Sequence, residues 1–161
     1  MNTLFDLTGR KAIVTGAAQG LAYSMAEGLM ESGAEVAVID ISDRTVEVAR
    51  EFCGRGFRCH GIQADLSRID ELEGVFSRAV DALGGLDIIV NGAGVQRRYR
   101  SEEFPTEEWD FVINVNLNSV WKLCQLAGRH FLENGGGKII NIASMLSFLG
   151  GYTVAAYAAS K

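Results

Sequence analysis

The chain has 161 residues and a formal net charge of -5 at pH 7, which predicts a single domain over residues 1–161. With 48% hydrophobic and 22% charged residues, the composition excludes a disordered chain, and the acidic balance argues against binding nucleic acid or an anionic membrane. The three cysteines lack the spacing of a zinc site or a disulfide framework, so no metal site is expected. No apolar run reaches about 18 residues and no signal pattern opens the chain, so we expect a cytoplasmic protein.

Apolar runs and amphipathic stretches alternate along the chain. The apolar runs predict strands at residues 11–15, 35–40, 86–90 and 138–142, and a more polar strand is predicted at residues 57–63. Helical spacing predicts helices at residues 21–32, 43–53, 67–83 and 106–133, with a further helix at 153–161. Apolar strands separated by helices are typical of a parallel sheet that is covered on both faces. The predicted fold class is therefore a doubly wound, Rossmann-like α/β sheet.

The turn after the first predicted strand is rich in small residues. It contains Gly16, Gln19, Gly20 and Leu21 and leads into a helix whose free N–H groups can hold a pyrophosphate. The second strand ends at Asp40, whose carboxylate can accept hydrogen bonds from an adenosine ribose and repels a 2′-phosphate. Each feature alone has a simpler explanation, a tight turn or a carboxylate near a helix start. Their joint spacing favours a dinucleotide site over these explanations, and the Asp40 carboxylate favours NAD over NADP.

A second group of polar residues lies near the end of the chain. Tyr157 and Lys161 stand four residues apart on a predicted helix, so they share a face, and the ammonium can stabilise a phenolate. Ser144 follows the fifth strand and can donate a hydrogen bond to an oxygen that gains charge during hydride transfer. Taken singly, each has another explanation: Tyr157 as a half-buried core residue, Lys161 as a solvated residue at the end of the chain, and Ser144 as a turn residue. Together they predict acid/base chemistry at the phenol.

In this order, the motifs resemble the short-chain dehydrogenase/reductase family. The resemblance covers the whole chain and includes the glycine turn at residues 15–22, Asp65-Leu66, Asn91-Gly92-Ala93-Gly94, Asn116, Ser144 and the pair Tyr157 and Lys161. It implies an NAD-dependent oxidoreductase that transfers a hydride between nicotinamide and a hydroxyl or keto group. A member of this family is commonly a homotetramer, assembled through the long fourth helix and the helix at residue 153.

The resemblance also implies roles for individual residues. Tyr157 is expected to be the catalytic acid/base, and Lys161 to bind the nicotinamide ribose. Ser144 is expected to orient the substrate carbonyl, and Asn116 to hold a proton-relay water. The residues expected around the adenosine side of the cofactor are Asp65, Leu66, Asn91, Ala93 and Gly94.

Two stretches have a narrower likeness. Residues 96–99 and 138–151 look like the branch of the family that uses NAD on ring-opened sugar acids of the 2-deoxygluconate or 2-dehydro-3-deoxy-gluconate type. Independently, Arg97 and Arg98 follow the fourth strand on the ligand side of the sheet, and guanidinium groups suit a carboxylate. The alternative is a solvated arginine loop. We expect at least one of these arginines to anchor the substrate carboxylate, near Ser144.

The chain departs from the family pattern in three places. Ala22 replaces the last glycine of the turn, a change that the helix-packing role of this position can tolerate. Gly92 stands where the family usually has a second asparagine that ties the fourth strand to its neighbours, so we expect a looser central sheet. The chain ends at Lys161, whereas family members continue through further strands. We therefore expect a fold that is incomplete at its carboxyl-terminal end, with an open sheet edge, an exposed apolar face and weakened assembly.

Two other functions remain compatible with these residues. One is a catalytically silent module that binds NAD without turning over substrate. The other is a 3-oxoacyl-thioester reductase of the same family, which Asp40 disfavours because those reductases usually take NADPH. The reading that accounts for most of the motifs is a sugar-acid dehydrogenase.

Overall fold

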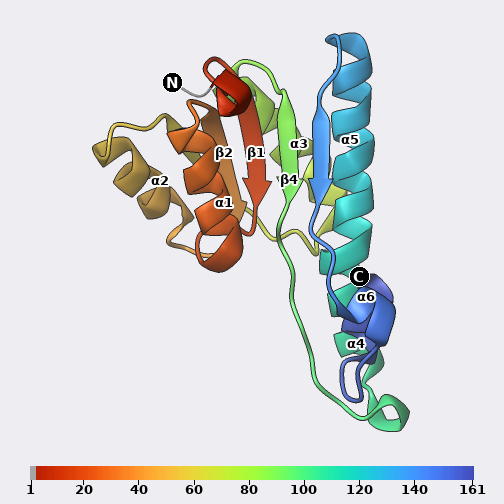
Figure 1. Cartoon of the computed structure of the whole chain (residues 1–161). Coiled ribbons are helices and arrows are strands. Elements are labelled where there is room, and N and C mark those ends of the chain that lie inside the picture. The colour runs from red at the N-terminus through yellow and green to blue at the C-terminus, as the bar shows by residue number, and fades with distance from the viewer. Residues whose placement is uncertain (1–2) are drawn as a thin grey trace.

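The structure is a computed structural model that describes residues 3–161. Five parallel strands form one sheet in the order β3-β2-β1-β4-β5 (Figure 1). This order confirms the predicted doubly wound α/β fold. The strands are β1 (Lys11–Thr15), β2 (Glu35–Asp40), β3 (Cys59–Gln63), β4 (Ile88–Asn91) and β5 (Lys138–Asn141).

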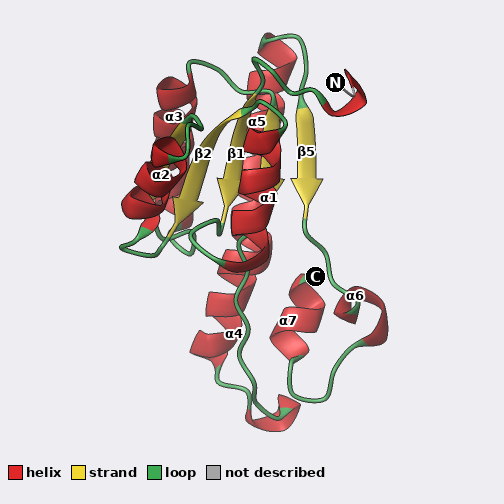
Figure 2. Ribbon diagram, turned by 60° about the vertical axis from the view of Figure 1, so that its left-hand side comes forward, coloured by secondary structure: helices red, strands yellow, loops and turns green. Residues whose placement is uncertain are grey.

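Helices cover both faces of the sheet and form a lobe beyond the carboxyl ends of its strands (Figure 2). Short 3-10 turns occur at Thr3–Phe5, Ile69–Glu71 and Ser101–Glu103, and a π-helical turn occurs at Asn114–Asn118. Within residues 3–161, no helix is both long enough and apolar enough to cross a membrane. The α-helices are α1 (Gly20–Glu31), α2 (Thr45–Gly54), α3 (Leu72–Leu83), α4 (Thr106–Ile113), α5 (Ser119–Glu133), α6 (Leu146–Leu149) and α7 (Ala155–Ser160).

Two predicted helices differ from the observed ones. The helix predicted from residue 67 begins at Leu72, because the Ser67 hydroxyl donates to Asp65 Oδ1 at 2.7 Å and so does not cap a helix. The helix predicted over 106–133 is interrupted by the π-helical turn that contains Asn116. Such turns are common at functional sites.

The alternation of side chains along the strands divides the core into two layers. Val14 and Val38 lie in the layer beneath α1 and α2, together with Phe52. Ile13 and Ile39 point to the opposite face and pack beneath α3 and α5. Because both faces of the central strands are buried, their sequences are continuously apolar, as in other parallel sheets.

The two outer strands of the sheet are less covered than the central ones. All four residues of β5 are exposed, and Ile139 and Ile140 are 39% and 45% exposed. β5 pairs with β4 on one side only. Within residues 3–161, the β5 edge of the sheet is therefore unpaired and carries exposed apolar side chains, as expected.

The buried thiol of Cys59 makes the stability of this fold depend on pH. Burial raises the pKa of Cys59 from its ordinary value of 9.0 to about 12. Above pH 9 the unfolded chain ionises this thiol and the folded chain does not, so the free energy of unfolding is expected to fall as the pH rises. Urea unfolding of a Cys59→Ala variant is expected to give a shallower decline above pH 9. Cys124, whose thiol lies beside Asn91 and Asn141, provides the control, since Cys124→Ala is expected to keep the full decline, and equal slopes in both variants would contradict this assignment.

Candidate functional site

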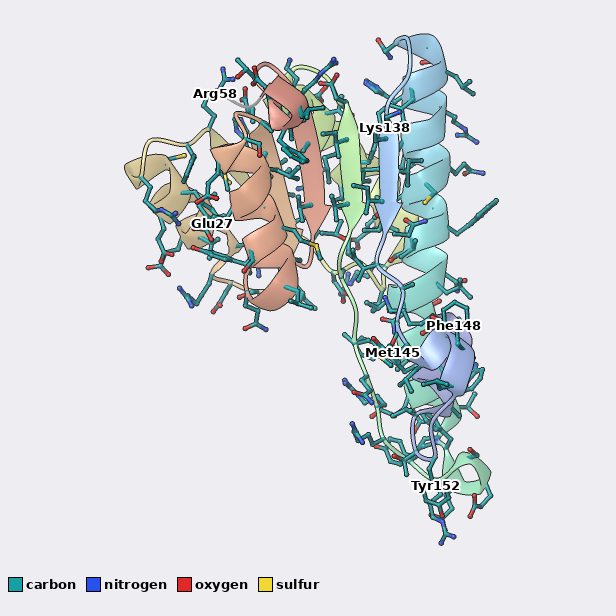
Figure 3. All side chains as sticks on the ribbon, viewed as in Figure 1. Glu27, Arg58, Lys138, Met145, Phe148 and Tyr152 are labelled. Carbon is teal, nitrogen blue, oxygen red and sulfur yellow. The ribbon has the colours of Figure 1, made fainter. Side chains whose placement is uncertain are left out.

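The carboxyl ends of the strands face a lobe built from α4, α6 and α7 (Figures 1 and 2). The segment that follows β4 runs along this lobe, and its Tyr99 N–H donates to the carbonyl of Thr153, just before α7, at 3.0 Å. Met145, Phe148 and Tyr152 are 75%, 90% and 78% exposed and lie on the same lobe (Figure 3). The lobe therefore carries large apolar side chains that are exposed.

Gly16 allows the turn after β1 to approach the end of β4. Its φ is +72°, and a Cβ at this position would lie 2.7 Å from the Cα of Ala93. The N–H of Gly16 donates to the carbonyl of Ile39 at 2.7 Å, which ties the turn to β2. No side chain caps α1, whose N-cap residue is Gln19, so the first N–H groups of the helix are free for a ligand. A pyrophosphate is the kind of group that such a helix start can hold.

A cavity of about 410 Å³ opens in front of this turn. The predicted cofactor residues that line it are Gly16, Gln19, Gly20, Leu21, Asp40, Asp65, Leu66, Ala93 and Gly94. Ala22 and Gly92, which belong to the predicted motifs, also line it, and the lining residues to which the sequence did not point are Ile41, Ala64, Val95, Phe111 and Val115. Ile41 and Ala64 were detectable by position alone, because each directly follows the end of a strand. Phe111 and Val115 lie on helical turns and carried no signal.

Two carboxylates stand at the rim of this cavity in fixed orientations. Asp40 accepts hydrogen bonds from the N–H of Ala18 and the N–H of Ser42, both at 3.0 Å. Asp65 accepts from the N–H and the hydroxyl of Ser67, at 2.9 and 2.7 Å. These bonds hold both carboxylates where a ligand in the cavity can reach them.

Asn91 differs from the other predicted cofactor residues. Its side chain is only 1% exposed and lies inside the sheet, outside the cavity lining. Its Nδ2 donates to Asn141 Oδ1 at 2.8 Å, which joins β4 to β5. Its Oδ1 has no hydrogen-bond partner among the described residues. The geometry therefore gives this side chain a contact within the sheet and none with the cavity.

Asn116 connects the segment after β4 to α7. It makes a two-point contact with Val95, accepting from its N–H at 2.8 Å and donating to its carbonyl at 2.9 Å. Its Nδ2 also donates to the hydroxyl of Ser160 at 3.0 Å, and that hydroxyl donates to the carbonyl of Tyr157 at 2.9 Å. Asn116 is 3% exposed, so in this arrangement it fixes the position of α7.

Tyr157 and Lys161 line a second cavity of about 160 Å³. The Lys161 Nζ lies 5.9 Å from the centre of the Tyr157 ring and donates to the carbonyl of Ile142 at 2.8 Å. Burial lowers the pKa of the Lys161 ammonium below its ordinary value. The second cavity shares Leu21, Ala22, Gly92 and Gly94 with the first, so the two cavities are adjacent.

Ser144 lies at the end of β5 and is half-buried. Its hydroxyl accepts from the N–H of Leu146 at 3.2 Å, and its N–H donates to the Ser147 hydroxyl at 3.2 Å. Among residues 3–161 it has no hydrogen bond to Tyr157. The two side chains therefore belong to the same lobe without direct contact.

The two predicted substrate arginines differ in their surroundings. Arg97 Nε donates to Glu108 Oε2 at 2.7 Å, and its guanidinium lies 4.7 Å from the centre of the Phe111 ring. Arg98 is exposed and makes no ion pair within residues 3–161. Arg97 thus lies against Phe111, which lines the larger cavity, but neither arginine belongs to the lining of that cavity or of the cavity at Tyr157.

The arrangement of a glycine turn, a carboxylate at the end of β2 and a Tyr/Lys pair on α7 agrees with the comparison against known families. Residues 10–161 match the family model described as short chain dehydrogenase. The chain belongs to the short-chain dehydrogenase family.

Several characterised family members are similar to this chain. The 2-dehydro-3-deoxy-D-gluconate 5-dehydrogenase of Escherichia coli strain K12 is 45% identical over 98% of this chain, which covers 62% of that protein. The 5-keto-D-gluconate 5-reductase of the same organism is 39% identical over 100% of this chain and 64% of its own length. A crystal structure of a gluconate 5-dehydrogenase from Burkholderia cenocepacia in complex with NADP and tartrate has a TM-score of 0.91, at 35% identity, covering 98% of this chain and 62% of that one. The chain thus spans less than two thirds of the length of these relatives.

Two departures of this short-chain dehydrogenase from the family pattern lie in contact. A Cβ on Gly92 would lie 2.9 Å from the Cβ of Ala22, and 2.8 Å from the carbonyl oxygen of Thr15. Ala22, which stands where the family turn has a glycine, therefore fills the space beside Gly92, which stands where the family has an asparagine. The N–H groups of Gly92 and Ala93 donate to the Thr15 hydroxyl at 3.1 and 3.2 Å, which links the end of β4 to β1 without an asparagine side chain.

Proposed function

We propose that this chain is the cofactor-binding and catalytic part of an NAD-dependent dehydrogenase that acts on a hydroxyl or keto group of a sugar acid. The observation that carries the proposal is that two adjacent cavities share Gly92 and Gly94, with the glycine turn in one and Tyr157 with Lys161 in the other. A dinucleotide that extended from one cavity to the other would have its pyrophosphate at the start of α1. The same cavity supports the proposal that the chain is one dinucleotide-binding domain.

Each group of predicted site residues has its own proposed role. Asp40 and Asp65 would bind the adenosine half, and Gly16, Gly20 and Leu21 would face the pyrophosphate. Bound nicotinamide supplies a hydride acceptor or donor. Tyr157 would exchange the proton of the substrate hydroxyl, with the Lys161 ammonium stabilising the phenolate. Ser144 would donate a hydrogen bond to the substrate oxygen, and Asn116 would position α7 and hold a relay water.

The choice of NAD over NADP is part of the proposal. The Asp40 carboxylate is held at the cavity rim by two backbone N–H groups, where its charge would repel a 2′-phosphate. The nearby Arg44, the kind of residue that can accommodate that phosphate, instead pairs with Glu47 and Glu51, at 3.7 and 3.4 Å. The NADP in the Burkholderia cenocepacia structure is the observation that makes a direct test necessary.

An Asp40→Asn variant tests the site and the cofactor together. The parent chain is expected to bind NADH at least about tenfold more tightly than NADPH. This difference corresponds to a repulsion of about 1.4 kcal/mol or more between the Asp40 carboxylate and the 2′-phosphate of NADPH. In Asp40→Asn the preference is expected to shrink or reverse, measured by fluorescence titration with each nucleotide. The exposed carboxylate of Asp43 lies outside the cavity lining, so Asp43→Asn is the matched control. Equal affinity of the parent chain for NADH and NADPH would contradict the assignment to NAD, and failure to bind either would contradict the whole proposal.

The sugar-acid substrate is supported by the relatives and by the arginines after β4. The double variant Arg97→Ala, Arg98→Ala is expected to raise KM for gluconate about tenfold, because a charge-assisted hydrogen bond to the carboxylate is lost. Arg98→Ala alone is expected to account for most of the change, because Arg97 is already paired with Glu108. Arg100 pairs with Glu102 at 3.1 Å, so Arg100→Ala is the control. An unaltered KM in the double variant would remove both arginines from the substrate site.

A further inference from the structure

A groove of about 350 Å³ runs along the outer edge of β3, apart from the proposed cofactor site. Its floor is formed by the four consecutive strand residues 59–62. One wall contains Ala49 and Arg50 of α2, and the other contains Arg78 and Ala82 of α3. We call it the β3 groove. It shares no lining residue with either part of the proposed cofactor site.

The backbone of β3 presents free hydrogen-bonding groups to this groove. β3 is an outer strand of the sheet and pairs with β2 alone. The Arg58 carbonyl accepts from Val36 and the Ala64 N–H donates to Asp40, so the even-numbered residues of this segment face β2. By the alternation of a parallel ladder, the N–H and the carbonyl of Gly61 face outward, into the groove. The Cys59 carbonyl also faces away from β2 and accepts a hydrogen bond from the Cys53 thiol at 3.3 Å.

The side chains of the groove are basic and apolar. Arg50 and Arg78 are exposed, and neither makes an ion pair with any residue from 3 to 161. The imidazole of His60, on the floor of the groove, already contacts Glu35 Oε1 at 2.8 Å. In a chain of net charge -5, the groove is therefore a local concentration of unpaired positive charge beside an open strand edge.

We propose that the β3 groove binds an extended acidic peptide segment of a partner protein, which adds to the sheet as a further strand beside β3. Main-chain hydrogen bonds to Gly61 would give the segment its extended conformation, and carboxylates on the segment would pair with Arg50 and Arg78. Apolar side chains between the carboxylates would pack on Ala49 and Ala82. A second copy of this chain fits less well, because pairing two β3 edges would bring the same unpaired arginines together twice.

The binding probe is a fluorescein-labelled peptide with the alternating core Glu-Val-Glu-Val-Glu, titrated into the 161-residue chain and followed by anisotropy. The variant Arg50→Gln, Arg78→Gln is expected to raise Kd at least tenfold. Arg44→Gln is the matched control, because Arg44 precedes α2, is exposed and pairs with Glu47 and Glu51 outside the groove. Hydrogen exchange at the Gly61 amide is expected to slow when the peptide binds. Urea unfolding of each variant checks that the fold is retained.

Four results would overturn the proposal. The first is no saturable binding of the acidic peptide. The second is equal binding by the neutral core Gln-Val-Gln-Val-Gln, or by a peptide in which prolines replace the valines and prevent strand pairing. The third is displacement of the peptide by an equimolar concentration of inorganic phosphate, which would identify a site for small anions. The fourth is a dimer in sedimentation that is lost in Arg50→Gln, Arg78→Gln, which would identify a second copy as the occupant. NADH titration in the same preparations keeps the outcome separate from the cofactor proposal.

Discussion

A Gly16→Ala variant is expected to lose most of its affinity for NADH and part of its stability. The added Cβ would lie 2.7 Å from the Ala93 Cα and 2.9 Å from the Ala93 nitrogen, both backbone atoms, so the turn or the end of β4 must move. The φ of +72° also places an alanine in the left-handed region, at a cost of about 1–2 kcal/mol. With the additional overpacking, we expect a loss of about 2–5 kcal/mol in the free energy of unfolding, measured with urea. Since the same turn faces the proposed pyrophosphate, the Kd for NADH is expected to rise at least about a hundredfold, equivalent to about 2.7 kcal/mol.

Gly9 provides a control with the same backbone strain and without the crowding. Its φ is +80°, and a Cβ there would meet nothing within 4 Å. Gly9→Ala is therefore expected to cost about 1–2 kcal/mol of stability and to leave the Kd for NADH unchanged. If Gly16→Ala binds NADH as the parent does, the close approach of the glycine turn to β4 is not what shapes the nucleotide site.

The strands were the part of the fold that could be predicted most accurately from the sequence. The predicted bounds of β1 and β2 are identical to the observed ones, because each is an apolar run that a glycine or a polar residue ends on both sides. The errors came where side chains compete with the backbone. Ser67 looked like a helix cap, but its hydroxyl turns back to Asp65. The π-helical turn at Asn114–Asn118 left no signal, since its apolar spacing is close to that of the helices on either side.

The candidate site, like the fold, could be predicted from the sequence only in part. Nine of the predicted cofactor residues line the larger cavity, because glycines and carboxylates just after strands carry a recognisable chemistry. Phe111 and Val115 were missed because an apolar residue on a helix looks like core whichever way it faces. Asn91 was predicted to bind the cofactor because it stands in one motif with Ala93 and Gly94, which line the cavity. Its side chain joins β4 to β5 instead, and the spacing of the motif does not distinguish these two roles. Gly92 and Ala22 appeared to be two independent departures until their contact was visible.

A Tyr157→Phe variant is expected to retain NADH binding and to lose turnover of gluconate by about a hundredfold to ten-thousandfold, the usual contribution of a positioned acid or base. The ring of Tyr157 lines the smaller cavity, and Phe preserves that surface while removing the only atom that can exchange a proton. The measurement is the rate of NADH formation at saturating gluconate and NAD, compared with the Kd for NADH from fluorescence. Tyr152, which is 78% exposed on the same lobe, supplies the control, and Tyr152→Phe is expected to keep the parent rate. A parent chain that binds NADH and forms none from gluconate would favour the silent nucleotide-binding module, whereas a Tyr157→Phe chain as active as its parent would exclude the phenol from the chemistry.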